Sequence, residues 1–252
     1  MSAASSSPAK TLKPAAPLGE LVYFGIRGRG EPVRLMLALH ECAWTETRPH
    51  EDEASRKEHA GTLAQPFGQW PLWRYERKRA GGETATAVLA QQDAILRHLA
   101  RRFGEYGVDA DADETVDEIL GGVESLRAKN AVLVYERELE PEAKAKYRAT
   151  HVDPASKTGR NSGAHLAYLD AFAARAQAAG KWVAGTEKPT IADVQVFDIV
   201  DVHARIFGEA ELRKLHPGLM YVYDRFRAVP SVDAYLGDAA RRAGVVNNNG
   251  LG

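Results

Sequence analysis

Short apolar runs and helical repeats alternate through the first hundred residues. Helical spacing of apolar side chains covers 31–41 and 93–103. Strand-like apolar runs occur at 21–24, 44–48, 66–75, where a turn precedes the strand, and 85–89. The pair Gly81-Gly82 lies between two of these runs and indicates a hairpin. The predicted order is strand–helix–strand followed by strand–strand–helix.

The second half of the chain shows only helical periods. Between 126 and 135 one face carries Leu126, Leu133 and Val134, and a second face carries Ala128, Val132 and Tyr135. A helix that is apolar on two faces is expected to be largely buried. Further helical patterns cover 165–178, 190–204 and 221–226, with interruptions at Pro141, 152–163 and Pro230.

A change of composition at 104–113, rich in Gly, Asp and Ala, predicts a linker between these halves. We therefore expect a disordered tail at 1–17, an α/β domain at 18–105 and an all-helical domain at 112–245. The tail is rich in Ala, Ser and Pro and contains no acidic residue. An organelle transit peptide is the alternative interpretation of that tail.

Composition and charge exclude several classes of function. The 252 residues carry a net charge of −1, which gives no field to attract nucleic acid or an anionic membrane. Apolar stretches are only a few residues long, whereas a membrane span needs roughly 20. The single cysteine, Cys42, forms no internal disulfide, so a reducing, cytoplasmic location is expected, with Cys42 as a buried small apolar residue. The eight histidines show no metal-binding spacing, and no metal is expected.

The junction after the first strand is the main candidate for chemistry. Tyr23 ends a strand-like run, a glycine-rich turn with Arg27 and Arg29 follows, and Glu31-Pro32 opens a helical pattern. Two arginines and a helix N-terminus near a hydroxyl all favour an anion. A thiolate is the anion that the rest of the chain supports.

Six stretches in register carry a resemblance to a known family. They are 22–31, Phe67-Gly68-Gln69-Trp70-Pro71, 91–99, 122–127, Gly185 with 190–193, and 230–236. Together they resemble the tyrosine-type cytosolic glutathione S-transferases, most closely the sigma and pi classes, over about residues 20 to 240. The resemblance implies a thioredoxin-like N-terminal domain, a helical C-terminal domain and a homodimer.

The same resemblance implies roles at the junction. Tyr23 would donate a hydrogen bond that stabilises the glutathione thiolate, and Arg29 would support the site. Arg27 fits a solvated surface arginine better. The alternative for Tyr23 is an ordinary aromatic residue packed in the core.

Glutathione itself would lie along two segments. Gln69, Trp70 and a cis Pro71 resemble the turn that pairs with the cysteinyl backbone. Gln91 and Gln92 precede a helix whose N–H groups would meet the γ-glutamyl carboxylate. The family usually has Ser at the position of Gln92, and simple helix capping is the alternative for both glutamines.

Two further positions depart from the family pattern and predict weaker glutathione binding. No lysine stands near Thr62 to meet the glycyl carboxylate, for which Arg56 or Lys57 would substitute. Ser125 occupies a position where many relatives have an Asp that reaches across the dimer. Loss of exposed ionic partners is worth only roughly 0–1 kcal/mol each, so weakening is expected and not abolition.

The electrophile pocket would include Phe24 and Tyr135. Tyr135 would donate a proton or hydrogen bond to the developing charge, or else pack as a core aromatic. Phe67 would insert into the partner subunit, or else pack within its own domain. Asp193 is expected to be structural, in a capping box with Thr190.

The predicted function is glutathione transfer to hydrophobic electrophiles. A glutathione-dependent isomerase, like the prostaglandin-synthesising sigma members, is one alternative. A non-catalytic transferase-like protein that carries ligands or serves structure is the other.

Overall fold

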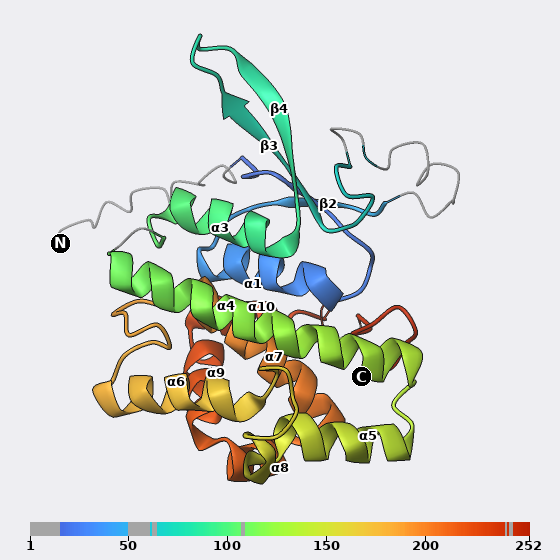
Figure 1. Cartoon of the computed structure of the whole chain (residues 1–252). Coiled ribbons are helices and arrows are strands. Elements are labelled where there is room, and N and C mark those ends of the chain that lie inside the picture. The colour runs from blue at the N-terminus through green and yellow to red at the C-terminus, as the bar shows by residue number, and fades with distance from the viewer. Residues whose placement is uncertain (1–15, 50–60, 62–64, 107–108, 240, 242–243) are drawn as a thin grey trace, which may run out of the picture.

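The N-terminal half is built around a four-stranded mixed sheet (Figure 1). This computed structural model describes residues 16–49, 61, 65–106, 109–239, 241 and 244–252. The strands are β1 (Glu20–Val22), β2 (Thr45–Thr47), β3 (Leu72–Lys78) and β4 (Thr84–Ala90), in the order β2-β1-β3-β4. β1 runs parallel to β2 and antiparallel to β3, and β3 pairs antiparallel with β4. The expected strand and hairpin pattern is confirmed.

Two helices separate the sheet from the helical half (Figure 1). They are α1 (Glu31–Leu39) and α3 (Gln92–Phe103), which pack against each other. α1 is buried from Glu31 to Ala38 because it also contacts α7 and α10 of the helical half. A helix enclosed on all sides fixes the turn that precedes it, η1 (Gly28–Gly30), and that turn follows Tyr23.

The second half of the molecule is helical. Its elements are α4 (Ala110–Ala131), η2 (Val132–Glu136), α5 (Pro141–Tyr147), η3 (Arg148–Val152), η4 (Pro154–Ser156), α6 (Leu166–Ala179), α7 (Ile191–Phe207), α8 (Glu209–Leu215), α9 (Pro217–Arg227) and α10 (Pro230–Gly237). η2 and η3 are π-helical turns, whereas η1 and η4 are 3₁₀ turns. α7 is the central helix, since it packs against α1, α4, α8 and α9.

A capping box starts α7, as the sequence indicates. The Thr190 hydroxyl accepts the Ala192 N–H at 3.2 Å, and the Asp193 carboxylate accepts the Thr190 N–H at 2.8 Å. The same carboxylate accepts the Val183 N–H at 2.9 Å, which fastens the preceding turn. The structural role expected for Asp193 is therefore confirmed.

The prediction that both apolar faces of 126–135 are buried is correct for only one face. Leu126, Leu133 and Val134 are buried, but 41% of Val132 and 46% of Tyr135 are exposed. The second face does not pack against the core because it borders open cavities. Other differences are local: α4 begins at Ala110 within the expected linker, and α10 begins at Pro230. Most of the predicted tail at 1–17 lies outside the described residues.

Candidate functional site

Tyr23 lies directly after β1, with its ring buried against the turn that follows. Its hydroxyl oxygen accepts the backbone N–H of Arg29 at 2.9 Å. Two glycines allow this close approach. A Cβ on Gly28 would lie 2.5 Å from the Tyr23 hydroxyl oxygen, and one on Gly30 would lie 2.5 Å from the ring carbon Cδ1. The turn therefore accommodates the phenol because Gly28 and Gly30 have no side chains that would occupy its place.

The protonation state of Tyr23 suits it to hydrogen-bond donation. Burial raises the pKa of its hydroxyl, and the Arg29 N–H only partly offsets that rise. The phenol is therefore neutral at pH 7 and keeps its hydrogen. Because the oxygen accepts from Arg29, the hydroxyl hydrogen remains free to point toward another group.

A cavity of about 230 Å³ opens beside Tyr23. It lies between the two halves of the chain, since its lining includes Arg29, Tyr135 from η2 and Val202 from α7. The last residues described also contribute, through Val246 and Asn247. The lining includes both apolar and charged residues, so the cavity combines apolar contact with hydrogen bonding.

Arg29 ties the Tyr23 turn to α4. Its guanidinium donates two hydrogen bonds to Glu124, at 2.8 and 2.7 Å. Planar two-point pairs of this kind fix orientation as well as distance. The pair is about 40% exposed on each side, so its contribution to stability is modest. Through its backbone N–H and its side chain, Arg29 joins the Tyr23 hydroxyl to α4.

Arg27 is not the surface residue that the sequence suggested. It is buried, and its guanidinium lies 3.2 Å from Asp201 on α7. Asp201 also accepts the Tyr223 hydroxyl at 3.1 Å and the Arg205 side chain at 3.0 Å. Arg27 is buried because it pairs with α7 of the helical half, and it lines the cavity beside Tyr23.

The segment 244–252 was missed as part of the site. The backbone N–H groups of Arg27 and Gly28 donate to the carbonyls of Val245 and Val246, both at 2.9 Å. The Tyr135 hydroxyl donates to Asn247 at 3.3 Å. The pair Val245-Val246 is too short to give a periodic signal in the sequence.

Tyr135 lines the same cavity as Tyr23. The alternative that it packs as a core aromatic is wrong, since nearly half of the side chain is exposed. Phe24 has a different surrounding. Its ring packs edge-on against Trp70, with centroids 5.4 Å apart, and Phe24 is not among the residues that line this cavity.

The two segments expected to hold glutathione are a turn and a helix start, although Gln92 is the first residue of α3 and does not precede it. The Trp70–Pro71 bond is cis, as expected. Gln91 precedes α3 with a φ of 72° and is exposed, whereas Gln92 is buried. The Gln92 side-chain oxygen has no hydrogen-bond partner within the part of the chain described. Gln69 is exposed beside this turn.

Of the two further positions that depart from the family pattern, the structure describes Ser125 but not Thr62. Ser125 donates to the Gly121 carbonyl of its own helix at 3.0 Å. Thr62, Arg56 and Lys57 lie outside the described residues.

Phe67 is 64% exposed, so the alternative that it packs within its own domain is wrong. Cys42 is half-buried against the core and is not a site residue.

Metal-binding clusters and membrane-spanning helices are both absent from the described residues. No cluster of His, Cys, Asp and Glu there has the arrangement of a metal site. None of the helices described is both long and apolar enough to span a membrane.

Comparisons with known proteins agree with this architecture. A family model described as the C-terminal domain of glutathione S-transferase matches residues 125–239. The pi-class glutathione S-transferase structure from Onchocerca volvulus superposes with a TM-score of 0.72, at 24% identity, and covers 93% of this chain and 100% of that one. That structure supports the shared fold.

Relatives extend the match to both halves. Glutathione S-transferase P 1 from Xenopus laevis is 26% identical over 222 residues, which are 88% of this chain and 92% of the relative. Glutathione S-transferase P from Caenorhabditis elegans is 30% identical over 237 residues, which are 92% of this chain and 98% of the relative. With that identity along nearly the full length of both proteins, the chain belongs to the glutathione S-transferase family.

Proposed function

We propose that this protein is a glutathione S-transferase in which Tyr23 stabilises the glutathione thiolate. One observation carries the proposal: a neutral phenol, fixed by the Arg29 N–H, at the edge of a cavity between the two halves. A cysteine thiol has a pKa of roughly 8.5, so it is mostly protonated at neutral pH. A donor aimed at the sulfur favours the thiolate and lowers that pKa.

The reaction needs only this one activation. Glutathione releases its thiol proton to solvent, and the thiolate accepts the Tyr23 hydrogen bond. The sulfur then forms a bond to the electrophilic carbon. In a substitution the leaving group departs with its electron pair, and in a conjugate addition the resulting enolate takes up a proton. Tyr135 lines the cavity, and its hydroxyl hydrogen would turn from Asn247 to the charge that develops on the electrophile.

Binding of the tripeptide is assigned to the exposed segments near Tyr23. Gln69 and the backbone of Trp70 and Pro71 would pair with the cysteinyl part of glutathione. Gln91 and the start of α3 would receive the γ-glutamyl carboxylate, because the first N–H groups of a helix favour anions. Gln92 would contribute its backbone only, because its side chain is buried.

A homodimer and a cytoplasmic location complete the proposal. In that dimer the exposed Phe67 ring would be the side chain that inserts into the partner subunit. The single cysteine, Cys42, supports a reducing compartment. Phe24 lies outside the cavity lining, so it would support the site through its edge-on contacts with Tyr23 and Trp70.

The test replaces Tyr23 by Phe, with Tyr75→Phe as the matched loss of a tyrosine hydroxyl outside the cavity. Hydrogen bonds to charged groups are worth about 1.5–3 kcal/mol, which is about one to two pKa units. We expect kcat/KM with 1-chloro-2,4-dinitrobenzene to fall about 10- to 100-fold at pH 6.5 in Tyr23→Phe only. The pKa of bound glutathione, followed by thiolate absorption, should rise in parallel. Equal rates in wild type and Tyr23→Phe would remove Tyr23 from the mechanism.

A further inference from the structure

One part of the lining of the Tyr23 cavity is both polar and buried. It consists of Arg27, Arg127, Asn130 and Asp198, each of which is at most 9% exposed. α4 supplies Arg127 and Asn130, and α7 supplies Asp198. The cavity measures about 230 Å³, below the range of about 300–1,000 Å³ that is typical of small-molecule sites. A ligand that fills so small a space must contact these buried polar groups.

Hydrogen-bonding atoms without partners are concentrated in this lining. Of the eight buried side-chain atoms that lack a hydrogen-bond partner in the described residues, four belong to it: Arg27 Nε, Arg127 Nε, Asn130 Nδ2 and Asp198 Oδ2. Arg127 Nε lies 4.0 Å from Glu124, which is beyond hydrogen-bond distance. Buried polar groups of native proteins are hydrogen-bonded in the great majority of cases. The lining is therefore built to bond a polar group as well as to enclose an apolar one.

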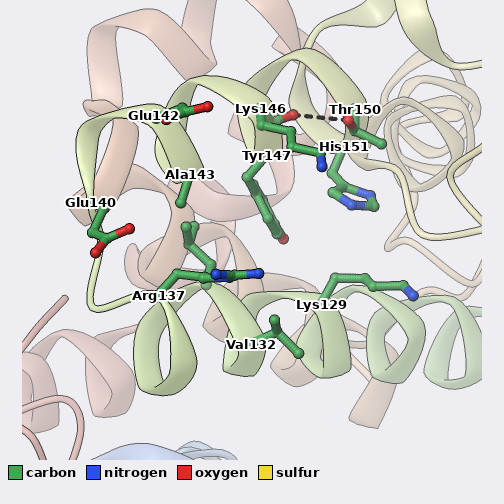
Figure 2. A pocket seen from close by; sticks show the side chains of 11 residues that line it. Lys129, Val132, Arg137, Glu140, Glu142, Ala143, Lys146, Tyr147, Thr150 and His151 are labelled. Carbon is green, nitrogen blue, oxygen red and sulfur yellow. Dashed lines mark hydrogen bonds between the residues drawn. The ribbon is translucent and has the colours of Figure 1, made fainter.

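Asn130 borders the Tyr23 cavity although its neighbours along the helix do not. Lys129 and Val132 border a separate space between α4 and α5 (Figure 2). Asn130 and Tyr135 are instead part of the lining beside Tyr23. The amide of Asn130 therefore lies on the side of the helix where the electrophile would bind.

The charges of the lining are already paired within the protein. Each arginine of the lining contacts a carboxylate: Arg27 with Asp201, Arg127 with Asp198, and Arg29 with Glu124. Arg205 also contacts Asp201, but it lies outside the lining and is partly exposed. A ligand with its own negative charge would add an unpaired charge to this buried set, which is unfavourable. The lining is therefore better matched to a neutral polar group.

The four atoms without partners include donors and an acceptor. The nitrogen atoms of Arg27, Arg127 and Asn130 donate, whereas Asp198 Oδ2 accepts. That oxygen lies 2.9 Å from Arg127 Nη1, but this ion pair lacks hydrogen-bond geometry. Burial raises the pKa of Asp198 to about 6, so its carboxyl group is still mainly ionised at pH 7 and remains an acceptor. A primary carboxamide matches such a set, because its oxygen accepts two hydrogen bonds and its nitrogen donates two.

We propose that the Tyr23 cavity selects neutral electrophiles that carry a carboxamide, and that Asn130 determines this preference. The inference rests on the proposed function and adds the class of its second substrate. The carboxamide oxygen would accept from Asn130 Nδ2, and its N–H would donate to Asp198 Oδ2. The reacting carbon would lie beside the thiolate at Tyr23. For an aryl chloride, the sulfur forms its bond to that carbon, chloride leaves with the electron pair of the broken bond, and the carboxamide is unchanged.

The test compares three aryl chlorides that differ only in the group opposite the chlorine. They are 4-chloro-3-nitrobenzamide, 4-chloro-3-nitrobenzotrifluoride and 4-chloro-3-nitrobenzoate. Each kcat/KM at pH 7 is divided by the rate constant of the uncatalysed reaction with glutathione, which removes differences in intrinsic reactivity. A site built to hydrogen-bond one group rejects analogues without it, because its buried polar atoms are then left unpaired. We expect the corrected value for the benzamide to exceed those for the trifluoride and the benzoate by at least about tenfold.

A pair of variants assigns the preference to one side chain. Asn130→Leu removes the amide at similar size and should lower the benzamide-to-trifluoride ratio at least about fivefold. Asn248→Leu makes the same replacement at an exposed position outside the cavity lining and should leave the ratio within about twofold.

The substrate comparison in the wild-type protein decides the proposal without any variant. Equal corrected values for the benzamide and the trifluoride would overturn it, and so would a larger value for the benzoate. An equal change of the ratio in Asn130→Leu and Asn248→Leu would overturn the role of Asn130. If the wild type conjugated none of the three chlorides, the proposed function would fail instead. Calorimetry with the preformed glutathione conjugates would then decide the carboxamide preference, since the benzamide conjugate should bind at least about tenfold more tightly than the trifluoride conjugate.

Discussion

Replacement of Gly30 by Ala tests whether the position of the Tyr23 ring depends on close packing. The new Cβ would lie 2.5 Å from Cδ1, 2.9 Å from Cγ and 3.1 Å from Cε1 of Tyr23. Carbon atoms prefer separations of about 3.5–4.0 Å, so the ring must move by about 1 Å. Gly30 has a φ of −80°, which Ala adopts freely, so the effect is steric and not conformational.

A shift of this size acts mainly on catalysis. Misplacement of a catalytic group by about 1 Å can cost about 100-fold in rate. We expect kcat/KM to fall about 10- to 100-fold, or about 1.4–2.8 kcal/mol. Overpacking should also lower the free energy of unfolding by about 1–3 kcal/mol. The measurements are conjugation of 1-chloro-2,4-dinitrobenzene and urea unfolding.

Gly121→Ala is the matched control. A Cβ there meets nothing within 4 Å, and the residue lies inside α4. Ala should therefore stabilise the protein by up to about 1 kcal/mol and leave kcat/KM unchanged. If Gly30→Ala retained full kcat/KM and full stability, the ring would not be held by the turn, and this account of Tyr23 would be refuted.

Three further outcomes follow from contacts described above. Thr190→Ala removes the hydroxyl that caps α7 and should lower the free energy of unfolding by about 1–2 kcal/mol in urea titrations; no change would exclude a stabilising cap. Glu124→Gln breaks the half-exposed pair with Arg29, so the free energy of unfolding should drop by under about 1 kcal/mol. The fall in kcat should correspond to a larger free-energy change; unfolding of the variant would contradict this. Burial lowers the pKa of His203 in the folded protein to about 4, so as the pH falls the unfolded state takes up a proton at this side chain before the folded state does. The free energy of unfolding should therefore fall by up to about 3 kcal/mol as pH drops from 6.5 toward 4. In His203→Gln this part of the loss of stability at low pH should vanish, as measured by urea unfolding at each pH.

Much of the fold was predictable because its signals are local. The hairpin at Gly81-Gly82 and the capping box at Thr190 depend on neighbouring residues, and both are confirmed. α5 and α8 were missed because each has only seven residues, too few to show a helical period. Helical periodicity also located the second apolar face at Val132, but not what that face contacts.

The candidate site also has parts that the local sequence predicts and parts that it does not. The strand, the turn and the helix that place Tyr23 follow one another in the chain, and the sequence locates them. The burial of Arg27 depends on Asp201, which lies 174 residues away. The contribution of Val246 to the cavity is equally remote, since it depends on a backbone bond to Gly28. Pairings over such separations leave no periodic or compositional mark.

The segment 129–135 faces two cavities, one beside Tyr23 and a second between α4 and α5 that Lys129, Val132 and Leu133 line, and this matters for protein engineering. A library that varies Tyr135 and Ala131 to change electrophile preference shares its backbone with Val132 and Leu133. Selection for a new conjugation activity would therefore reshape the second cavity as well. Libraries confined to Val202 and Val246 would alter the wall beside Tyr23 from other parts of the chain, and would leave the α4–α5 side of the molecule unchanged.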